Sequence, residues 1–246
     1  MRVTPDKVES IFPMPVAYYT YPNDKHEELK VAVRGAINRV RGTSNEDSSK
    51  LLHFYQNLKQ HLLYDNDDPI FQHFHDWLQD CYTNMVEEVQ GYKMNQTYMA
   101  ATNCYITDCW VNITSDNGEQ PPHFHVNAFI SGTYYLSTPP GSGRLQFINQ
   151  DTTPNHPNLG FDKYKHTGFN DRSHDIDVKE RTLILWPSHL VHCTEKTKGD
   201  VRRVSISMNF LPKVFCAGAY NFKVVKHDIE DLGNTYRTST QLFDES

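Results

Sequence analysis

The sequence predicts a mainly β (α+β) protein whose N-terminal part is helical. Between about residues 24 and 92, apolar residues recur every three or four positions, which is the period of amphipathic helices. From about residue 96, segments rich in Thr, Val, Ile and Tyr alternate with turns that contain Gly and Pro, which is typical of antiparallel strands. No linker separates the two parts, so both are expected to share one core.

We therefore expect a single domain over residues 1–246. Its parts are a helical N-terminal region at 1–95, a β core at 96–226 and a polar C-terminal tail at 227–246. A chain of 246 residues can bury a full core. The net charge of −6 argues against a dedicated nucleic-acid binder, because such proteins normally carry a basic excess.

The cysteines and the apolar runs bear on the cellular location. No apolar run approaches the roughly 20 residues that cross a bilayer, and the N-terminus has no signal-peptide pattern, so no membrane association is expected. The five cysteines form no CxxC pair and are odd in number, which favours free thiols in a reducing compartment. We expect a cytoplasmic protein, in the host cytoplasm if the chain is viral.

Three helices are expected in the N-terminal region. The first carries Leu29, Val33 and Ile37 on one face, and the third begins with Pro69, a residue favoured at the first helical position. The expected spans are about 24–41, 46–64, and Pro69 to near Gly91. Together these helices offer a surface for a homodimer.

The β core is expected to contain antiparallel strands joined by short turns and one long loop. The loop, 149–175, is polar, and a loop of that length in a compact domain is usually functional. A further short strand is expected near 16–19. The strands of the core are expected within 97–114, 122–136, 144–148, 181–186, 201–211 and 215–225.

The stretch 122–136 is interpreted as one long strand that begins with two histidines. Residues two apart in a strand point to the same side, so His123 and His125 share a face. Imidazole is the commonest protein metal ligand near neutral pH, and two of them on one face can hold one ion. The residues that follow on this face are mostly polar: Asn127, Ser131, Thr133 and Tyr135.

A second half of the site is expected where Trp186-Pro187-Ser188 turns the chain toward His192. Eleven residues later, Arg203 begins a strand in which polar residues alternate with apolar ones. An inward row that contains Arg203, Ser205, Ser207 and Asn209 would be costly in an ordinary core, because unpaired buried polar groups are destabilising. Such a row is suited to binding a carboxylate, since a guanidinium donates two parallel hydrogen bonds to its oxygens.

These features resemble the 2-oxoglutarate/Fe(II)-dependent oxygenases. The His-x-His-x-Asn motif, the Ser-Gly-Thr-Tyr-Tyr-Leu that follows it, and Trp110-Val111-Asn112 upstream are similar to the prolyl-hydroxylase-like members found in phage and marine bacteria. The resemblance covers about residues 104–212. It implies a double-stranded β-helix, or jelly roll, whose inner face holds iron, with the N-terminal helical region packed on it.

The resemblance also implies roles for single residues. His123 matches the first iron ligand and His192 the distal one. Arg203 would bind the distal carboxylate of 2-oxoglutarate, assisted by Ser205 or Ser207. The resemblance further places Tyr135 and Asn112 beside the cosubstrate.

One position departs from the family pattern. The usual ligand set has a carboxylate two residues after the first histidine, and here that residue is His125. Three arrangements remain open: a metal site of His123, His125 and His192; a two-histidine site in which His125 serves the substrate; and a shifted register with His125 first and Asn127 in the carboxylate's place. We prefer the first.

The resemblance implies a dioxygenase that uses Fe(II), 2-oxoglutarate and O2. It would hydroxylate an unidentified small-molecule or peptide substrate, such as a prolyl or other peptide side chain, and release succinate. Two alternatives stay open. One is a cupin-like metalloenzyme with three histidines and no 2-oxoglutarate, and the other is a non-enzymatic β-domain that binds a ligand or partner.

Other histidines and an arginine are not assigned to the site. His73 and His75 form the same His-x-His pattern, but in a helix residues two apart point about 200° away from each other and cannot chelate one ion. His189 is expected in a loop. Arg202 is expected to be solvated, because it falls on the apolar parity of its strand.

Overall fold

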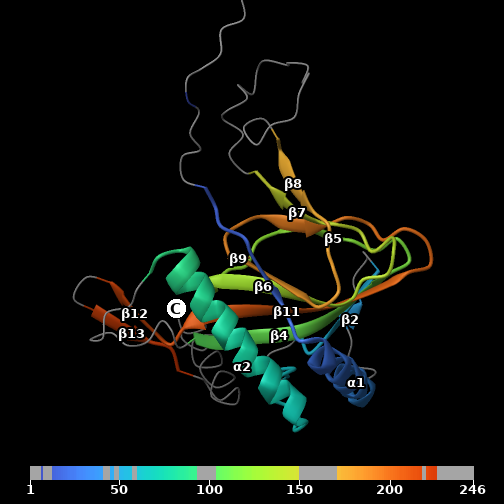
Figure 1. The fold of residues 1–246 in the computed structure, drawn as a ribbon, viewed down its shortest axis with the longest axis horizontal. Helices are drawn as coiled ribbons and strands as arrows, with labels where there is room; N and C mark the ends of the chain where they lie inside the picture. Colours follow the sequence, from blue (N-terminus) through green and yellow to red (C-terminus); the bar gives the residue numbers. More distant parts are fainter. Residues whose placement is uncertain are drawn as a thin grey trace, which may run out of the picture.

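Eight consecutive strands, β4 to β11, form two facing antiparallel sheets (Figure 1). In the larger sheet the order of these strands is β9-β6-β11-β4, and in the smaller sheet it is β5-β10-β7-β8. The chain therefore crosses between the sheets at every connection except the one from β7 to β8, as in a jelly roll. The bounds are β4 Cys104–Ser115, β5 Gln120–His123, β6 Ile130–Ser137, β7 Leu145–Ile148, β8 Ser173–Ile176, β9 Thr182–Pro187, β10 His192–Thr194 and β11 Arg202–Pro212.

This computed structural model describes part of the chain. It comprises residues 7, 13–40, 45–46, 50–56, 60–92, 104–149, 171–217 and 220–225. All of the expected polar tail at 227–246 and most of the loop at 149–175 lie outside the described residues.

Strands from outside the jelly roll widen the larger sheet at both edges. β1 (Ala17–Thr20) pairs with β9, and β3 (Leu51–Phe54) pairs with β4 and with the two-residue β2 (Asn45–Glu46). A separate hairpin, β12 (Val214–Ala217) with β13 (Tyr220–Lys223), follows β11. The N-terminal region is therefore not only helical, because three of its segments are strands of the larger sheet.

Two helices cover the face of the larger sheet that points away from the smaller one (Figure 1). They are α1 (Asn23–Arg39) and α2 (Pro69–Asn84), and α2 continues as the π-helical turn η1 (Met85–Val89). The two helices confirm the expected helices at 24–41 and after Asp68. Asp68 caps α2, because its side chain accepts a hydrogen bond from the Ile70 amide at 3.1 Å.

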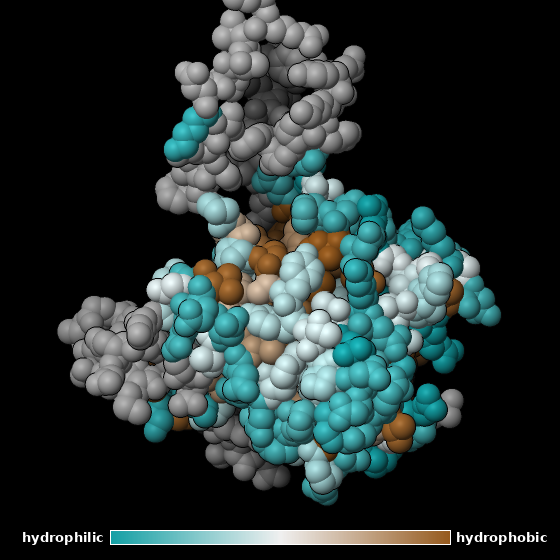
Figure 2. Space-filling model, in the orientation of Figure 1, coloured by the Kyte–Doolittle hydropathy of each residue, from teal (hydrophilic) through white to brown (hydrophobic). Residues whose placement is uncertain are grey.

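The helices and the larger sheet share the main hydrophobic core. Tyr21, Phe74 and Tyr134 are fully buried there, and their rings contact one another with centroid separations of 5.0 to 5.8 Å. A second, smaller core lies between the sheets and includes Leu145, Phe147 and Trp186. On the face shown in Figure 2, hydrophilic residues cover most of the helical layer, as expected for its solvent side.

The expected helix at 46–64 is wrong. The segment supplies β2 and β3 instead, and β3 aligns Leu51 with Thr114 and Phe54 with Val111. The spacing of Leu51, Leu52 and Tyr55 suits a helix, but the edge of β4 presents unpaired backbone groups that a strand can satisfy. Tertiary pairing therefore overrides the local helical pattern.

The single long strand expected at 122–136 is also wrong in part. β5 ends at His123 and β6 begins at Ile130, and the segment between them is irregular, with Asn127 at a φ of 57°. The break lets the chain cross from the smaller to the larger sheet. His125 therefore lies beyond the strand that carries His123.

We predict that Phe74→Ala lowers the free energy of unfolding by about 3–5 kcal/mol, because it empties the centre of the aromatic cluster between α2 and β6. Urea denaturation measures the change. Val31→Ala on α1 is the control, since Val31 is 71% exposed and its loss should change stability by no more than about 0.5 kcal/mol. Equal losses in both variants would contradict this assignment of the core.

Candidate metal and anion site

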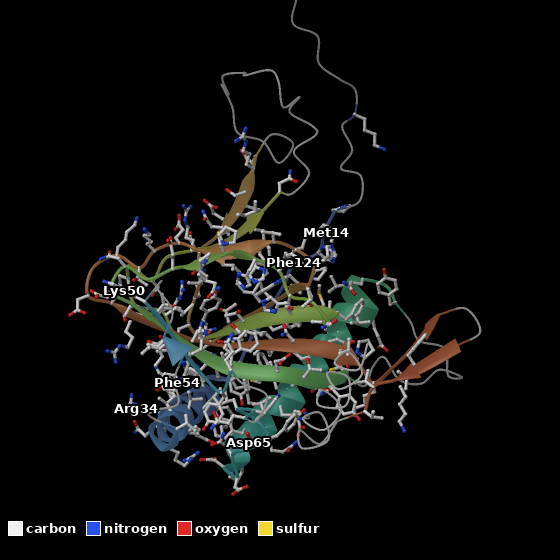
Figure 3. All side chains as sticks on the ribbon, turned by 180° about the vertical axis from the view of Figure 1, so that it is seen from behind. Met14, Arg34, Lys50, Phe54, Asp65 and Phe124 are labelled. Atoms are coloured by element: carbon white, nitrogen blue, oxygen red, sulfur yellow. The ribbon has the colours of Figure 1, made fainter. Side chains whose placement is uncertain are left out.

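A cavity of about 350 Å³ opens between the two sheets. Residues from β4, β6 and β11 line its floor, and residues from β5 and β10 line its opposite wall. Figure 3 shows Phe124 between the sheets, beside a gathering of side-chain nitrogen atoms. The cavity brings together every residue of the preferred assignment: Asn112, His123, His125, Tyr135, His192, Arg203, Ser205 and Ser207.

His123 and His192 face each other across two paired strands. They are register partners in the ladder of β5 with β10, and their ring centroids are 4.3 Å apart. In each ring Nδ1 is hydrogen-bonded to the backbone carbonyl two residues earlier, Pro121 O at 2.8 Å and Leu190 O at 2.9 Å. A carbonyl can only accept, so each Nδ1 carries the proton and each Nε2 keeps its lone pair.

His125 completes the group from the segment after β5. Its backbone amide donates to Ser188 O at 3.0 Å, and its Nδ1 is hydrogen-bonded to Asn209 Oδ1. Its ring centroid lies 5.2 Å from that of His123 and 5.1 Å from that of His192. One nitrogen from each ring lies within 4.8 Å of the others, so the three imidazoles can converge on one ion.

The environment keeps all three imidazoles neutral, which is the form that binds metal. Burial lowers the pKa of His123 and of His125. Burial, with a smaller contribution from neighbouring His123, lowers the pKa of His192 to about 3. The donor set therefore fits a divalent transition metal that accepts nitrogen ligands, including Fe(II).

The shifted register is not favoured by the geometry. Asn127 is exposed and is not among the residues that line the cavity. Its left-handed backbone lies in the irregular crossing between the sheets. The side chains that meet are His123, His125 and His192, as in the arrangement we prefer.

Arg203 is a buried cation whose partners among the described residues are all neutral. Its guanidinium donates to Ser142 O at 2.9 Å, to Thr114 Oγ1 at 3.1 Å and to Thr194 Oγ1 at 3.0 Å. The residue is only 3% exposed, and burial lowers its pKa, as expected for a cation without a counter-ion. An uncompensated buried charge is costly, so this end of the cavity is built to receive an anion.

Tyr135 and Ser205 complete the surroundings of Arg203. They are register partners on β6 and β11, and both are buried side chains that line the cavity. Burial raises the pKa of Tyr135 to about 12, against the opposing effect of Arg203, so its hydroxyl keeps its proton. Arg203, Tyr135 and Ser205 therefore offer hydrogen-bond donors to one carboxylate.

Asn112 and Ser207 are engaged with each other. Asn112 Nδ2 donates to Ser207 Oγ at 2.8 Å, and Ser207 Oγ lies 3.0 Å from Thr133 Oγ1. Asn112 Oδ1 also accepts from the Trp110 indole at 2.9 Å and lies 2.7 Å from His53 Nδ1. These bonds make a continuous polar wall along the floor of the cavity.

Sequence reasoning missed two residues of this site. His53 lines the cavity from β3, and it was overlooked because its segment was expected to be helical. Asn209 was placed on the inward face of its strand but received no role. Asn209 could have been found because it lies on the same face of its strand as Arg203. Nothing in the sequence indicates that Asn209 contacts His125.

The fold and the site together define a class of protein. It is a jelly roll in which three histidine nitrogens and a buried arginine face one interior cavity. Residues 108–209 match the model of the family described as "Putative 2OG-Fe(II) oxygenase". The match spans nearly all of β4 to β11, which confirms the resemblance predicted from the motifs. Fe(II) and 2-oxoglutarate are the metal and cosubstrate of that family. A comparison with curated protein sequences gives no match.

Solved structures of this class share the fold at low sequence identity. HygX from Streptomyces hygroscopicus, solved with nickel, 2-oxoglutarate and hygromycin B, has a TM-score of 0.51 and 13% identity, covering 87% of this chain and 93% of its own. AviO1 from Streptomyces viridochromogenes Tue57 has a TM-score of 0.51 and 14% identity, covering 80% and 89%. The alpha-ketoglutarate-dependent carbocyclase SnoK, from nogalamycin biosynthesis, has a TM-score of 0.53 and 8% identity, covering 80% and 79%.

These likenesses confirm the predicted double-stranded β-helix. Within the described part of the chain, no helix combines the length and the apolar character that a bilayer crossing requires. The homodimer and the cytoplasmic location remain predictions.

We predict that 2-oxoglutarate stabilises the protein through Arg203. At a concentration of one hundred times its Kd, a ligand that binds only the folded state adds about 2.7 kcal/mol to the unfolding free energy. Arg203→Met should abolish this gain in thermal or urea unfolding, because it removes the cation that is expected to bind the carboxylate.

The control is Arg202→Met, since Arg202 is exposed and precedes Arg203 on the same strand. This variant should keep the full stabilisation. If Arg203→Met were stabilised as strongly as Arg202→Met, the anion would bind elsewhere.

Proposed function

We propose that the protein is an Fe(II)- and 2-oxoglutarate-dependent dioxygenase that hydroxylates its substrate. The carrying observation is that one cavity holds both a neutral three-histidine group and a buried arginine without a carboxylate partner among the described residues. The first suits a divalent metal and the second suits the far carboxylate of a dicarboxylic acid. A cosubstrate that spans the two positions satisfies both.

The overall reaction balances without a further reductant. 2-Oxoglutarate, O2 and a substrate C–H bond give succinate, CO2 and a C–OH group, one oxygen atom entering succinate and the other the alcohol. Iron, when bound, supplies the site at which O2 is reduced. The protein supplies ligands, orientation and exclusion of water.

The polar residues assigned to the site have separate roles in this proposal. His123, His125 and His192 hold iron through Nε2. Arg203 binds the distal carboxylate, with Tyr135 and Ser205 donating to the same group. Asn112 and Ser207 form the wall along which the cosubstrate lies.

Apolar side chains between the sheets keep water from the end of the cavity that contains Arg203. Leu145 lines the cavity and is 2% exposed, and Phe147 and Trp186 pack beside it in the inner core. The Trp186 ring also contacts His192, with centroids 4.8 Å apart. In such surroundings the charge of Arg203 acts on the cosubstrate with little screening.

The mouth of the cavity favours an uncharged substrate group. Phe124 and Val126 line the cavity yet are 53% and 68% exposed, so they present apolar surface beside the histidines. Arg203 is the one Lys, Arg, Asp or Glu among the described residues that line the cavity, and it is assigned to the cosubstrate. A prolyl or another uncharged peptide side chain fits such a mouth.

A second candidate is a cupin-like enzyme that does not use 2-oxoglutarate. It is favoured by His125, because three neutral ligands leave the metal without the usual carboxylate. It gives no role to Arg203. Binding of 2-oxoglutarate to the metal-loaded protein separates the two candidates.

We predict that iron-loaded protein exposed to O2 forms succinate from 2-oxoglutarate. It should also show a metal-to-ligand absorption band when 2-oxoglutarate is added without oxygen. His192→Ala and Arg203→Ala should each lose at least about tenfold in both signals, because one removes a metal ligand and the other the carboxylate partner.

His189→Ala and Arg202→Ala serve as matched controls, since both residues are exposed neighbours of the altered positions. Both controls should keep the band and the turnover. Tight metal binding without any band or succinate would reject the oxygenase and favour the cupin-like candidate.

We predict that blocked peptides with an uncharged apolar central residue stimulate succinate formation more than peptides centred on Lys or Glu. The reason is the apolar mouth at Phe124 and Val126. Val126→Asp should reduce the stimulation several-fold, whereas Val31→Asp, equally exposed but on α1, should not. Stronger stimulation by the charged peptides would contradict the proposed substrate class.

A further inference from the structure

We propose that Asn209 and Asp108 are positioning residues that make His125 a metal ligand. The inference rests on the proposed function, because it concerns the same three-histidine site. Its basis is a hydrogen-bonded chain that runs from the His125 ring through the Asn209 amide to the Asp108 carboxylate. No role for either residue follows from the sequence motifs.

His125 is held differently from the other two histidines. The rings of His123 and His192 are fixed by backbone carbonyls two residues earlier in the chain, which are present whatever the side chains are. The His125 ring is fixed by a side chain of β11, a strand of the opposite sheet. Its orientation therefore depends on the identity of Asn209.

The partners of Asn209 set the direction of its amide. Asn209 Nδ2 donates to Asp108 Oδ2 at 3.2 Å, and the Ser131 hydroxyl donates to Asn209 Oδ1 at 2.9 Å. A carboxylate accepts only, so it holds the NH2 end and leaves the oxygen facing His125. The imidazole must then carry its proton on Nδ1, which frees Nε2 for a metal.

A β-bulge places Asp108 where this is possible. Asn209 pairs with Asp108 and Phe210 pairs with Ile106, so Thr107 is an extra residue in β4. The bulge lets Ile106 face the hydrophobic core while Asp108 stays on the side of Trp110 and the cavity. Without the extra residue, the alternation of the strand would put Ile106 and Asp108 on the same face.

The chain also bears on the missing carboxylate. In the family pattern a carboxylate follows the first histidine, and here its position is taken by His125. The exposed carboxylate of Asp108 nevertheless supplies a negative charge that is linked to the metal position through the hydrogen bonds of Asn209. Such outer partners raise the basicity of a ligating imidazole.

The test measures the binding of Ni(II) and Co(II) to the full chain without cosubstrate. Asn209→Ala should lower the affinity for both metals by about 10–100-fold, which is the usual effect of losing the hydrogen-bond partner of a metal ligand. It should also change the visible absorption spectrum of the bound Co(II), because the third ligand is displaced. Asp108→Asn should have the same effects to a smaller degree. Without the carboxylate, the side-chain amide of Asn209 can flip and exchange its oxygen and nitrogen.

Two further variants separate positioning from a general loss of structure. In the double variant Asn209→Asp with Asp108→Asn, the carboxylate at position 209 still accepts a hydrogen bond from His125, and the amide at position 108 donates to that carboxylate. The double variant should therefore have the spectrum and the affinity that Asn209→Ala loses. Gln146→Ala removes another amide-to-carboxylate bond, from Gln146 Nε2 to Asp175 Oδ1 at 2.9 Å, on the outer side of the smaller sheet. It should leave both readouts unchanged.

The outcomes distinguish this inference from the proposed function. If the unaltered protein binds neither metal, the proposed site itself is rejected. If it binds Co(II) and Asn209→Ala binds equally well with an identical spectrum, the site stands and the positioning role of Asn209 is overturned. An affinity loss that the double variant does not restore would likewise overturn it.

Discussion

The pairing of β11 with both β4 and β6 is the constraint on which fold and site depend. One face of β11 carries Arg203, Ser205 and Asn209 toward the cavity, while the other buries Ile206 and Met208 against the helices. A slip of one residue would exchange the two faces, exposing the core residues to the cavity. The apolar face therefore fixes the register, and the register places the polar face.

Much of this could be read from the sequence, because strands alternate with a period of two. The inward row that begins at Arg203 was predicted from that alternation. The meeting of His123 with His192 came from a family resemblance, since residues so distant in sequence are paired by topology. The resemblance to the family and the jelly roll are confirmed, while the metal and cosubstrate assignments of single residues remain proposals.

The sequence was misleading where tertiary pairing outweighs local pattern. The segment containing Leu51 and Leu52 has a helical period but pairs with the edge of β4, and His53 was overlooked as a result. The chain after His123 leaves its strand to change sheets, which alternation alone cannot reveal. The bulge at Thr107 adds one residue that no periodic reading detects, so the partner of Asn209 was not foreseen.

The attachment of β3 has a consequence for motion. Within the described residues, this four-residue strand pairs on one side with β4 and on the other with the two-residue β2. It is short and lies near the edge of the larger sheet, so we expect it to belong to the part of the sheet that opens locally before the whole domain unfolds. Because His53 lies on β3, an opening of this edge would uncover one wall of the cavity while the smaller sheet, which carries His123 and His192, stayed closed. Amide hydrogens of β3 would then exchange faster than those of β11.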